Sequence, residues 1–467
     1  MISSRSLVGV VLFVGSVLGS VLACGSDTST FTSQGVDAGP DGSGPLGFAS
    51  SDASGPCTGI ACQRVACSGG ATTTVTGTVF APNGTLPLYN VIVYVPQAPL
   101  SDIPVDLTCD HCGSVSGSPL VSTLSQADGT FRLENVPAGS NVPLVLQVGK
   151  WRRQVMLPTL TACQNNALTD ANLTRLPRDK SEGSIPKIAV TTGKCDELAC
   201  LLPKLGLAAS EVTPNTGDGR LNVYQGHRYD NGNLDAPAPA GTPSAEDLYS
   251  NFSRYDIVVL SCECGTYAED YTAKKRQKLY DYVSAGGRLF ASHLQYGWLY
   301  DTPLRDVATW RDPEDLNTSP DGPFLVDQSF DKGKALASWL VTVNATAEAD
   351  RGTIPLAEPR EDVGAITSSA QRWIYAKTTT QGLRPESAKY YSVNAPVGVD
   401  TTQQCGKFVF ADVHLAHVDE TAIEPDNGFP GSCGADLTPE EKALAFLFFD
   451  LASCVQDDKQ PPAPPVK

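Results

Sequence analysis

Two stretches of sequence decide the fold: YDIVVLSCEC at residues 255–264 and GGRLFASH at residues 286–293. Each contains a short continuous apolar run, which is typical of a strand that is buried on both faces. Between them, residues 273–283 predict an amphipathic helix with Leu279 and Val283 on one face. Strand, helix and glycine-led strand in this order predict a parallel, doubly wound α/β sheet.

The sequence on both sides extends this α/β domain to residues 184–455. Residues 185–191 predict a further buried strand, and a helix is expected after it from 196 to 205. Pro203 shortens or kinks that helix, because a proline inside a helix costs about 3 kcal/mol. The sequence TPEE at 438–441 is a capping box with proline at the first helical position, so a helix closes the domain.

Polar residues gather where three of the predicted strands end. Ligands of doubly wound sheets bind beyond the carboxyl ends of the strands, so these residues are the candidate site. Imidazole and carboxylate groups ligate divalent metals and aromatic rings stack on sugars, which predicts a pocket for a divalent metal or a sugar. In the alternative interpretation, the histidines are ordinary hydrogen-bonded side chains. The candidates are His293, His414 and His417 as metal ligands, Glu263 beside His293 and His414 as a catalytic group, and Tyr296, Trp298, Asp412 and His417 as ligand-binding residues.

Before this domain, residues 57–176 predict a small antiparallel β-sandwich. Valines alternate with other residues at 75–79 and 91–95, around the turn Asn83-Gly84, and further short strands are expected within 131–157. The stretches 77–91 and 126–139 resemble the two markers of the carboxypeptidase regulatory-like, or transthyretin-like, family. The resemblance implies a non-catalytic adhesive or spacer domain.

The sequences GGRLFASH at 286–293 and GKFVFADVH at 406–414 resemble motifs of the ThuA-like group within the class I glutamine amidotransferase-like fold, a flavodoxin-like architecture. Amidotransferases need a cysteine at the strand-to-helix elbow, where this chain has His293. Imidazole cannot form the thioester of glutamine hydrolysis. The resemblance therefore implies the fold and not the reaction, and it favours a non-catalytic role.

The N-terminus predicts export. Arg5 precedes an apolar run that ends in VLAC at 21–24, too short to span a bilayer stably. It resembles a bacterial lipoprotein signal over residues 1–23, which implies lipidation of Cys24 and attachment to the outer membrane; a plain secretory peptide is the alternative. Residues 24–56 read as a disordered tether, and 456–467 as a proline-rich tail.

The chain contains 14 cysteines, which favours an oxidising compartment and disulfide bonds. In the CDHC sequence at 109–112, a structural disulfide is preferred to zinc or redox chemistry. Cys262 and Cys264 are expected to bond to Cys200 and Cys195, the six cysteines of 57–163 to close within the sandwich, and Cys405 to stay free. The disulfide candidates are Cys57, Cys62, Cys67, Cys109, Cys112, Cys163, Cys195, Cys200, Cys262, Cys264, Cys433 and Cys454.

Charge and architecture leave two hypotheses for function. With 34 basic and 51 acidic residues the chain has a formal charge of −17, which disfavours nucleic acid and anionic lipid headgroups as partners. The first hypothesis is a non-catalytic envelope lipoprotein whose α/β domain binds a carbohydrate or a protein. The second is a metal-dependent hydrolase of an envelope or extracellular saccharide.

The whole arrangement also resembles bacterial lipoproteins that are sometimes labelled tryptophan synthase alpha chain. The residues do not support that label, because the sequence lacks an eightfold β/α repeat and carries an export signal.

Overall fold

The computed structural model describes residues 59–193, 195–228, 234–235, 238, 241–265, 271–311, 322–377, 386–415, 431–434 and 436–465. All of them belong to one compact unit, Pro56–Lys467. The expected signal, Cys24, the tether, Cys57 and His417 lie outside the described residues. Within the described part of the chain, no helix has the length and apolar character needed to cross a membrane.

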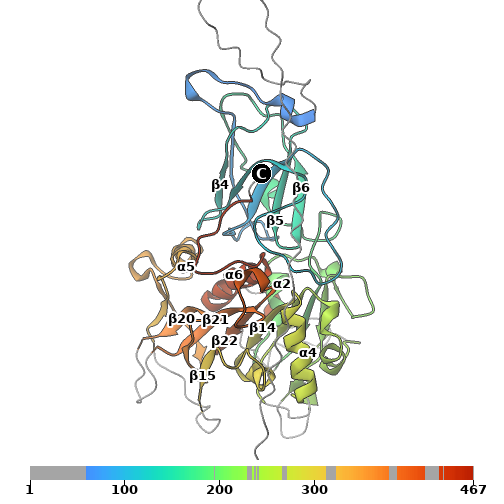
Figure 1. Cartoon of the computed structure of the whole chain (residues 1–467), viewed down its shortest axis with the longest axis vertical. Helices are drawn as coiled ribbons and strands as arrows, with labels where there is room; N and C mark the ends of the chain where they lie inside the picture. The colour runs from blue at the N-terminus through green and yellow to red at the C-terminus, as the bar shows by residue number, and fades with distance from the viewer. Residues whose placement is uncertain are drawn as a thin grey trace, which may run out of the picture. The chain divides into compact units, whose positions relative to one another are not determined.

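A ten-stranded mixed sheet forms the α/β region (Figure 1). Its parallel part comprises six strands, and four antiparallel strands continue the sheet beyond β22. In spatial order the strands are β9 (Val212–Thr213), β10 (Leu221–Tyr224), β8 (Ile188–Thr191), β13 (Ile257–Leu260), β14 (Arg288–Ser292), β22 (Gly406–Ala411), β21 (Ala388–Ala395), β20 (Gln371–Ala376), β16 (Phe324–Val326) and β17 (Thr353–Ile354).

The strand order creates a topological switch point between β8 and β13. From β8 the chain proceeds to β9 and β10 on one side, and then crosses to β13 and β14 on the other side. Connections that leave two adjacent parallel strands in opposite directions open a crevice at their carboxyl ends, where ligands of α/β proteins bind. Cys262 lies beyond the end of β13, at this crevice.

Helices cover both faces of the sheet, since neighbouring residues of each strand enter different cores. Val259 belongs to the core that includes α5 (Asp331–Thr342), α6 (Pro439–Ala452) and α2 (Leu201–Lys204). Val258 belongs to the core that includes α3 (Ala245–Tyr249) and α4 (Ala273–Ser284). α6 begins with the capping box that the sequence predicts. The helix expected over 196–205 is short, as Pro203 predicts: a 3-10 turn, Leu198–Cys200, leads into the four-residue α2.

The sandwich consists of a three-stranded and a four-stranded sheet, antiparallel except for the β1–β7 pair. Its strands are β4 (Thr130–Leu133), β1 (Thr74–Thr78) and β7 (Asn165–Ala167) in one sheet, and β3 (Pro119–Leu124), β2 (Ile92–Pro96), β5 (Pro143–Val148) and β6 (Trp151–Met156) in the other. The remaining elements are α1 (Ala171–Thr174) and the pairs β11 (His227–Arg228) with β12 (Leu234–Asp235), β15 (Ala308–Trp310) with β19 (Val363–Ile366), and β18 (Glu358–Pro359) with β23 (Val413–His414).

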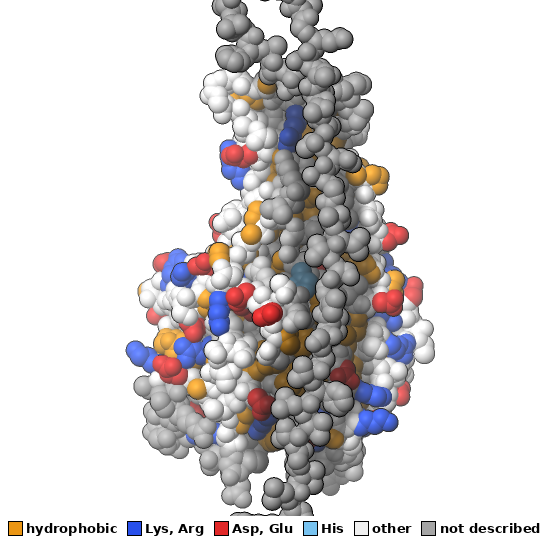
Figure 2. Space-filling view, viewed as in Figure 1, with side chains coloured by type: hydrophobic (Ala, Val, Ile, Leu, Met, Phe, Trp, Pro, Cys, Tyr) orange, Lys and Arg blue, Asp and Glu red, His pale blue; other side chains and the backbone are white. Residues whose placement is uncertain are grey.

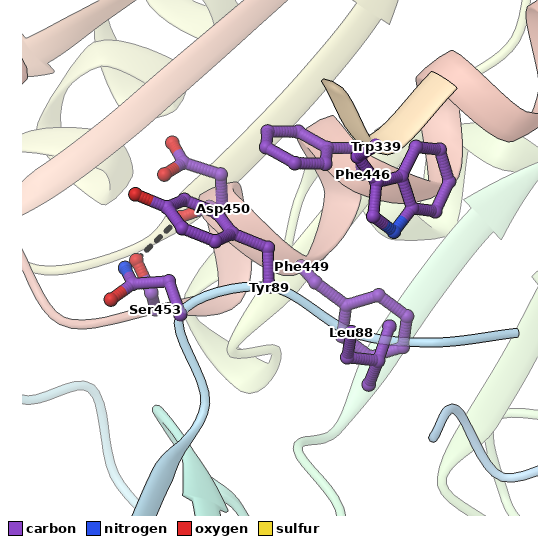
Figure 3. A pocket seen from close by; sticks show the side chains of 8 residues that line it. Leu88, Tyr89, Trp339, Phe446, Phe449, Asp450 and Ser453 are labelled. Carbon is purple, nitrogen blue, oxygen red and sulfur yellow. Dashed lines mark hydrogen bonds between the residues drawn. The ribbon is translucent and has the colours of Figure 1, made fainter. Parts of the chain in front are cut away.

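The sandwich and the α/β region share one continuous hydrophobic core. The Trp339 indole N–H donates to the Pro87 carbonyl oxygen at 2.8 Å. The Tyr89 ring stacks on Phe446 with the ring centroids 5.5 Å apart. Figure 3 shows Tyr89, Trp339 and Phe446 among the side chains that line a small cavity between residues 88–90 of the sandwich and the helices α5 and α6. The sandwich is therefore packed against the α/β region within this unit.

Two disulfides also join the sandwich to the α/β region, which corrects the expectation that its cysteines close among themselves. Cys109 bonds to Cys405 and Cys112 bonds to Cys454. Cys405 is thus not the free thiol. The prediction failed because the 109–112 loop lies against the α/β region, a long-range contact that cysteine spacing does not reveal. Within the sandwich, Cys67 bonds to Cys163.

Basic and acidic side chains are interspersed over the face of the molecule drawn in Figure 2. This face therefore presents no extended basic surface among its described residues.

Candidate functional site

Three side chains converge beyond the carboxyl ends of neighbouring parallel strands, and we call them the thiol–imidazole cluster: Cys262, His293 and His414. The Cys262 sulfur lies 3.3 Å from His293 Nδ1 and 3.7 Å from His414 Nε2. The two ring nitrogens are 2.7 Å apart. The structure thus brings together two of the three histidines that the sequence singles out, and it places the Cys262 thiol beside both of them.

His293 occupies the elbow between β14 and the short helical segment His293–Leu299, with φ of +39°. Left-handed backbone is unfavourable for a residue with a Cβ and persists where the surroundings fix it, commonly at functional sites. Here the elbow directs an imidazole toward the Cys262 thiol.

Carboxylates lie against the outer nitrogens of both rings. Asp362 Oδ2 is 3.1 Å from His293 Nε2, although the two atoms are not aligned as a hydrogen bond. Glu358 Oε2 is 2.9 Å from His414 Nδ1, because Glu358 in β18 pairs directly with His414 in β23. Carboxylates in these positions orient imidazoles as metal ligands.

His414 can adopt either of two tautomers, because both Arg360 and Glu358 lie within hydrogen-bond distance of its Nδ1. Its Nη2 lies 2.7 Å from His414 Nδ1 and 3.2 Å from the same Glu358 oxygen. When Nδ1 carries the proton and donates to Glu358, Nε2 presents a lone pair to the cluster. When Nδ1 accepts from Arg360, Nε2 carries the proton and donates to His293. A metal ion selects the first form, because it needs the lone pair.

Burial keeps the cluster neutral. It lowers the pKa of His293 to about 4 and also lowers the pKa of His414. It raises the pKa of the Cys262 thiol well above its ordinary value. Neutral imidazole is the form that ligates metals, whereas a buried neutral thiol is a poor nucleophile. This environment favours ligation over attack by Cys262 on a substrate.

Several buried polar atoms around the cluster have no hydrogen-bond partner among the described residues. Buried polar groups are nearly always paired, so such a concentration marks a place where water, an ion or a ligand binds. Burial also raises the pKa of Asp362 and of Asp412 to about 6. The atoms are His293 Nε2, Asp362 Oδ2, Asp412 Oδ1 and Gln295 Oε1.

Other predicted site residues take different positions. Glu263 accepts a hydrogen bond from the Tyr249 hydroxyl at 3.3 Å. Asp412 accepts from the Val363 N–H and pairs with Lys389 Nζ, each at 3.2 Å, which makes it a supporting residue.

The two aromatic residues proposed for ligand stacking are packing residues, which corrects that expectation. Trp298 is 1% exposed and packs edge-on against Tyr249. Tyr296 is 5% exposed and lies beside Tyr300 and Trp310. A ring must present an open face to stack on a sugar, and the aromatic residues of the 293–299 segment instead complete the core below the site.

Sequence reasoning missed the role of Cys262, because Cys262 and Cys264 were both expected to form disulfides with Cys195 and Cys200, with no pairing assigned among the four. Cys264 bonds to Cys195, whereas Cys200 bonds to Cys433. Cys262 is the free cysteine of the described residues and is fully buried. Its place directly after a buried strand at the switch point was the available signal. Glu358 and Asp362 had no comparable signal, since Glu358 lies in the two-residue strand β18 and Asp362 lies just before β19.

The chemistry of the donor set suits a borderline or soft divalent metal such as zinc. One sulfur and two ring nitrogens are typical zinc ligands. Tetrahedral bonds of about 2.3 Å to sulfur and about 2.0–2.1 Å to nitrogen put sulfur and nitrogen about 3.6 Å apart. The observed separations of 3.3 and 3.7 Å are close to this value. The two ring nitrogens, which are 2.7 Å apart, would have to move apart by less than about 1 Å to bind the same tetrahedral ion.

The cysteines near His111 cannot form a second metal site. His111 lies close to both Cys109 and Cys405. Those two cysteines are bonded to each other, so neither offers a thiolate.

No known protein family profile matches the chain, and no curated protein matches it. A solved putative ThuA-like protein from Bacteroides uniformis is 10% identical over 56% of this chain and 88% of its own, with a TM-score of 0.29. Two type II cohesin–X–dockerin complex chains from Acetivibrio cellulolyticus, a C-terminal and an N-terminal interface mutant, are 16% and 12% identical. They cover 31% and 29% of this chain and 78% and 85% of their own, with TM-scores of 0.15 and 0.17. Because these TM-scores are low, the α/β assignment rests on this chain's own strand order.

Proposed function

We propose that the α/β region is a metal-dependent hydrolase domain of an exported envelope protein, acting on an envelope or extracellular saccharide. The observation that supports it is the convergence of Cys262 Sγ, His293 Nδ1 and His414 Nε2 within 3.7 Å of one another at the switch point. Three protein ligands and one open position are the arrangement of catalytic zinc sites.

Some residues of the chain would bind the ion, and others orient its ligands. Cys262, His293 and His414 hold the ion, while Asp362 and Glu358 fix the ring orientations from outside. When bound, a divalent ion with an open position lowers the pKa of a bound water and so supplies hydroxide near neutral pH. Lys389 beside Asp412 provides positive charge in the next layer, which limits the net negative charge around the site.

The proposal includes export and attachment through a lipid on Cys24, which leaves the folded unit outside the cytoplasm. Five disulfides between described cysteines support an oxidising compartment. Labelling with a palmitate analogue tests the anchor. Wild-type protein is expected to take up label and a Cys24→Ser variant to lose it, whereas equal label in both would overturn the anchor.

A second candidate is a non-catalytic domain that binds a carbohydrate or a protein. The burial of the cluster favours it, since Cys262, His293 and His414 are 0%, 5% and 9% exposed. A substrate would have little direct access to an ion held there in this conformation.

Metal analysis of protein purified without a histidine tag discriminates the two. The hydrolase predicts stoichiometric zinc or another transition metal, lost in a His293→Ala/His414→Ala variant and retained in a His111→Ala control, whose histidine lies outside the cluster. A metal-free wild-type protein whose melting temperature does not change with added zinc, cobalt or nickel would overturn the hydrolase and leave the binding role.

A further inference from the structure

We propose that the Cys195–Cys264 disulfide controls whether the metal site is open or closed, so that the α/β region is active when oxidised and blocked when a dithiol reduces that bond. The inference rests on the proposed metal site and adds its regulation. It follows from a fourth potential ligand that the structure places beside the cluster and that the disulfide occupies.

The fourth ligand is Cys195. The potential ligand atoms of Cys195, Cys262 and His414 all lie within 4.8 Å of one another. In the disulfide form the Cys195 sulfur is bonded to Cys264 and carries no charge, so it is not a metal ligand. The ion then has the three cluster ligands and an open position. Cys264 is not part of this close group.

The loop that carries Cys195 is held at the site independently of the disulfide. The Cys195 N–H donates to the Cys262 carbonyl at 3.2 Å, and the Asp196 carboxylate accepts from the Cys262 N–H at 3.1 Å and from the Leu415 N–H at 2.6 Å. Asp196 also accepts a hydrogen bond from the Ser292 hydroxyl. The Asp196 carboxylate therefore joins the ends of β13, β14 and β23, and Cys195 stays beside Cys262 when the S–S bond breaks.

Gly193, two residues before Cys195, adds to this anchoring. Gly193 follows β8 so closely against β13 that a Cβ there would collide with the Cys262 carbonyl oxygen. Only glycine allows this approach, which sets the path of the loop before Cys195 is reached.

The redox step balances with a dithiol as reductant. The dithiol transfers two electrons and two protons to the S–S bond, which breaks to give the Cys195 and Cys264 thiols, and the dithiol becomes a disulfide. The Cys195 thiol then loses its proton to solvent as its sulfur bonds to the metal. Two sulfurs and two ring nitrogens make a closed, structural type of site, in which no position remains for water.

Cobalt substitution of two single variants tests the inference. Cys264→Ala and Cys195→Ala both remove the disulfide, but only Cys264→Ala leaves a thiol at Cys195. Cobalt-loaded Cys264→Ala is expected to show about twice the thiolate-to-cobalt charge-transfer absorbance of oxidised wild type, because two thiolates replace one. Cobalt-loaded Cys195→Ala is expected to match oxidised wild type. Wild type that is reduced with dithiothreitol and freed of it by desalting before cobalt loading is expected to match Cys264→Ala, which covers the case that one variant fails to fold.

The outcomes separate the inference from the proposed function. Equal single-thiolate spectra in all four samples would overturn the redox control and leave the metal site intact. A sample set in which no form binds cobalt would overturn the metal site itself. A Cys67→Ala/Cys163→Ala variant, which removes a disulfide of the sandwich, is expected to keep the oxidised wild-type spectrum.

Discussion

Two buried polar clusters of the α/β region differ in how completely their atoms are paired. The paired-ion cluster comprises Lys332, Lys407, Asp450 and Asp458. Lys332 Nζ lies 2.7 Å from Asp450 and 2.6 Å from Asp458, and Lys407 Nζ lies 2.7 and 3.0 Å from the same two carboxylates. None of their side-chain atoms lacks a partner, whereas the surroundings of the thiol–imidazole cluster contain several that do.

This difference in pairing distinguishes a cluster that stabilises the fold from a cluster that can bind a ligand. The paired-ion cluster joins α5, β22, α6 and the segment after α6, so its charges stabilise one arrangement of these elements. Burying a charge is costly unless it is paired, and here each charge has two partners. The thiol–imidazole cluster leaves donors and acceptors for something other than the protein, which is expected of a binding site and not of a core.

The largest expected effect is on stability. Lys332→Ala leaves Asp450 and Asp458 with one cation in place of two, and removal of one partner of a buried ion pair costs about 3–5 kcal/mol. Urea unfolding with the disulfides intact should show this loss, while cobalt affinity stays within about twofold. A stability change below about 1 kcal/mol would contradict the structural role of the paired-ion cluster.

A smaller effect is expected from Glu358→Gln, on metal binding and not on stability. Outer carboxylates of metal-bound histidines typically contribute about 10–100-fold to metal affinity. Cobalt titration should show a loss in that range. The exposed pair Glu348–Arg351 offers a control, because Glu348→Gln should leave cobalt affinity unchanged. Equal affinities in both variants would mean that Glu358 does not orient His414 toward an ion.

The smallest effect is expected from a half-buried ion pair, Arg175–Glu182, which is paired like the paired-ion cluster but is less buried. Arg175 holds Glu182 through two bonds of 2.6 Å and lowers its pKa from 4.5 to about 2. A depressed carboxyl pKa stabilises the fold above pH 4.5, and that stability is lost as pH falls through 2. Glu182→Gln should therefore cost about 1–2 kcal/mol at pH 7, allowing for partial exposure.

The pH profile provides the check for Glu182. The difference in unfolding free energy between wild type and Glu182→Gln should shrink steadily below pH 4.5 and vanish near pH 2. A difference that stays constant across this range would show that packing, and not ionisation, causes the loss.

The sequence predicted the strands and the helix that position the site better than it predicted which side chains contact one another there. The strands ending at Leu260 and Ser292 and the helix over 273–284 follow from local apolar patterns, and so does the gathering of His293 and His414 at one sheet end. The partner of Cys262 does not, because disulfide choice depends on where distant loops such as 431–434 approach the strands.

Local sequence patterns also could not predict the roles of Lys332 and Glu358. Lys332 lies in a helix whose sequence permits an exposed lysine, and only the approach of α6 and the following segment makes it a buried partner. Glu358 comes from a two-residue strand, too short to be recognised from alternation. Long-range packing supplies both contacts.

The disulfides from the 109–112 loop have a mechanical consequence. Cys112 and Cys454 are 342 residues apart in sequence but covalently joined, and Cys109 and Cys405 form a second bond beside them. A force pulling on the two ends of the chain would pass through these bonds and bypass the sheet between them. At about 3.3–3.6 Å per residue, roughly 1,100 Å of chain length could not be extended while the bonds remain. Under tension the ends of the chain could stretch, whereas the thiol–imidazole cluster would carry no load.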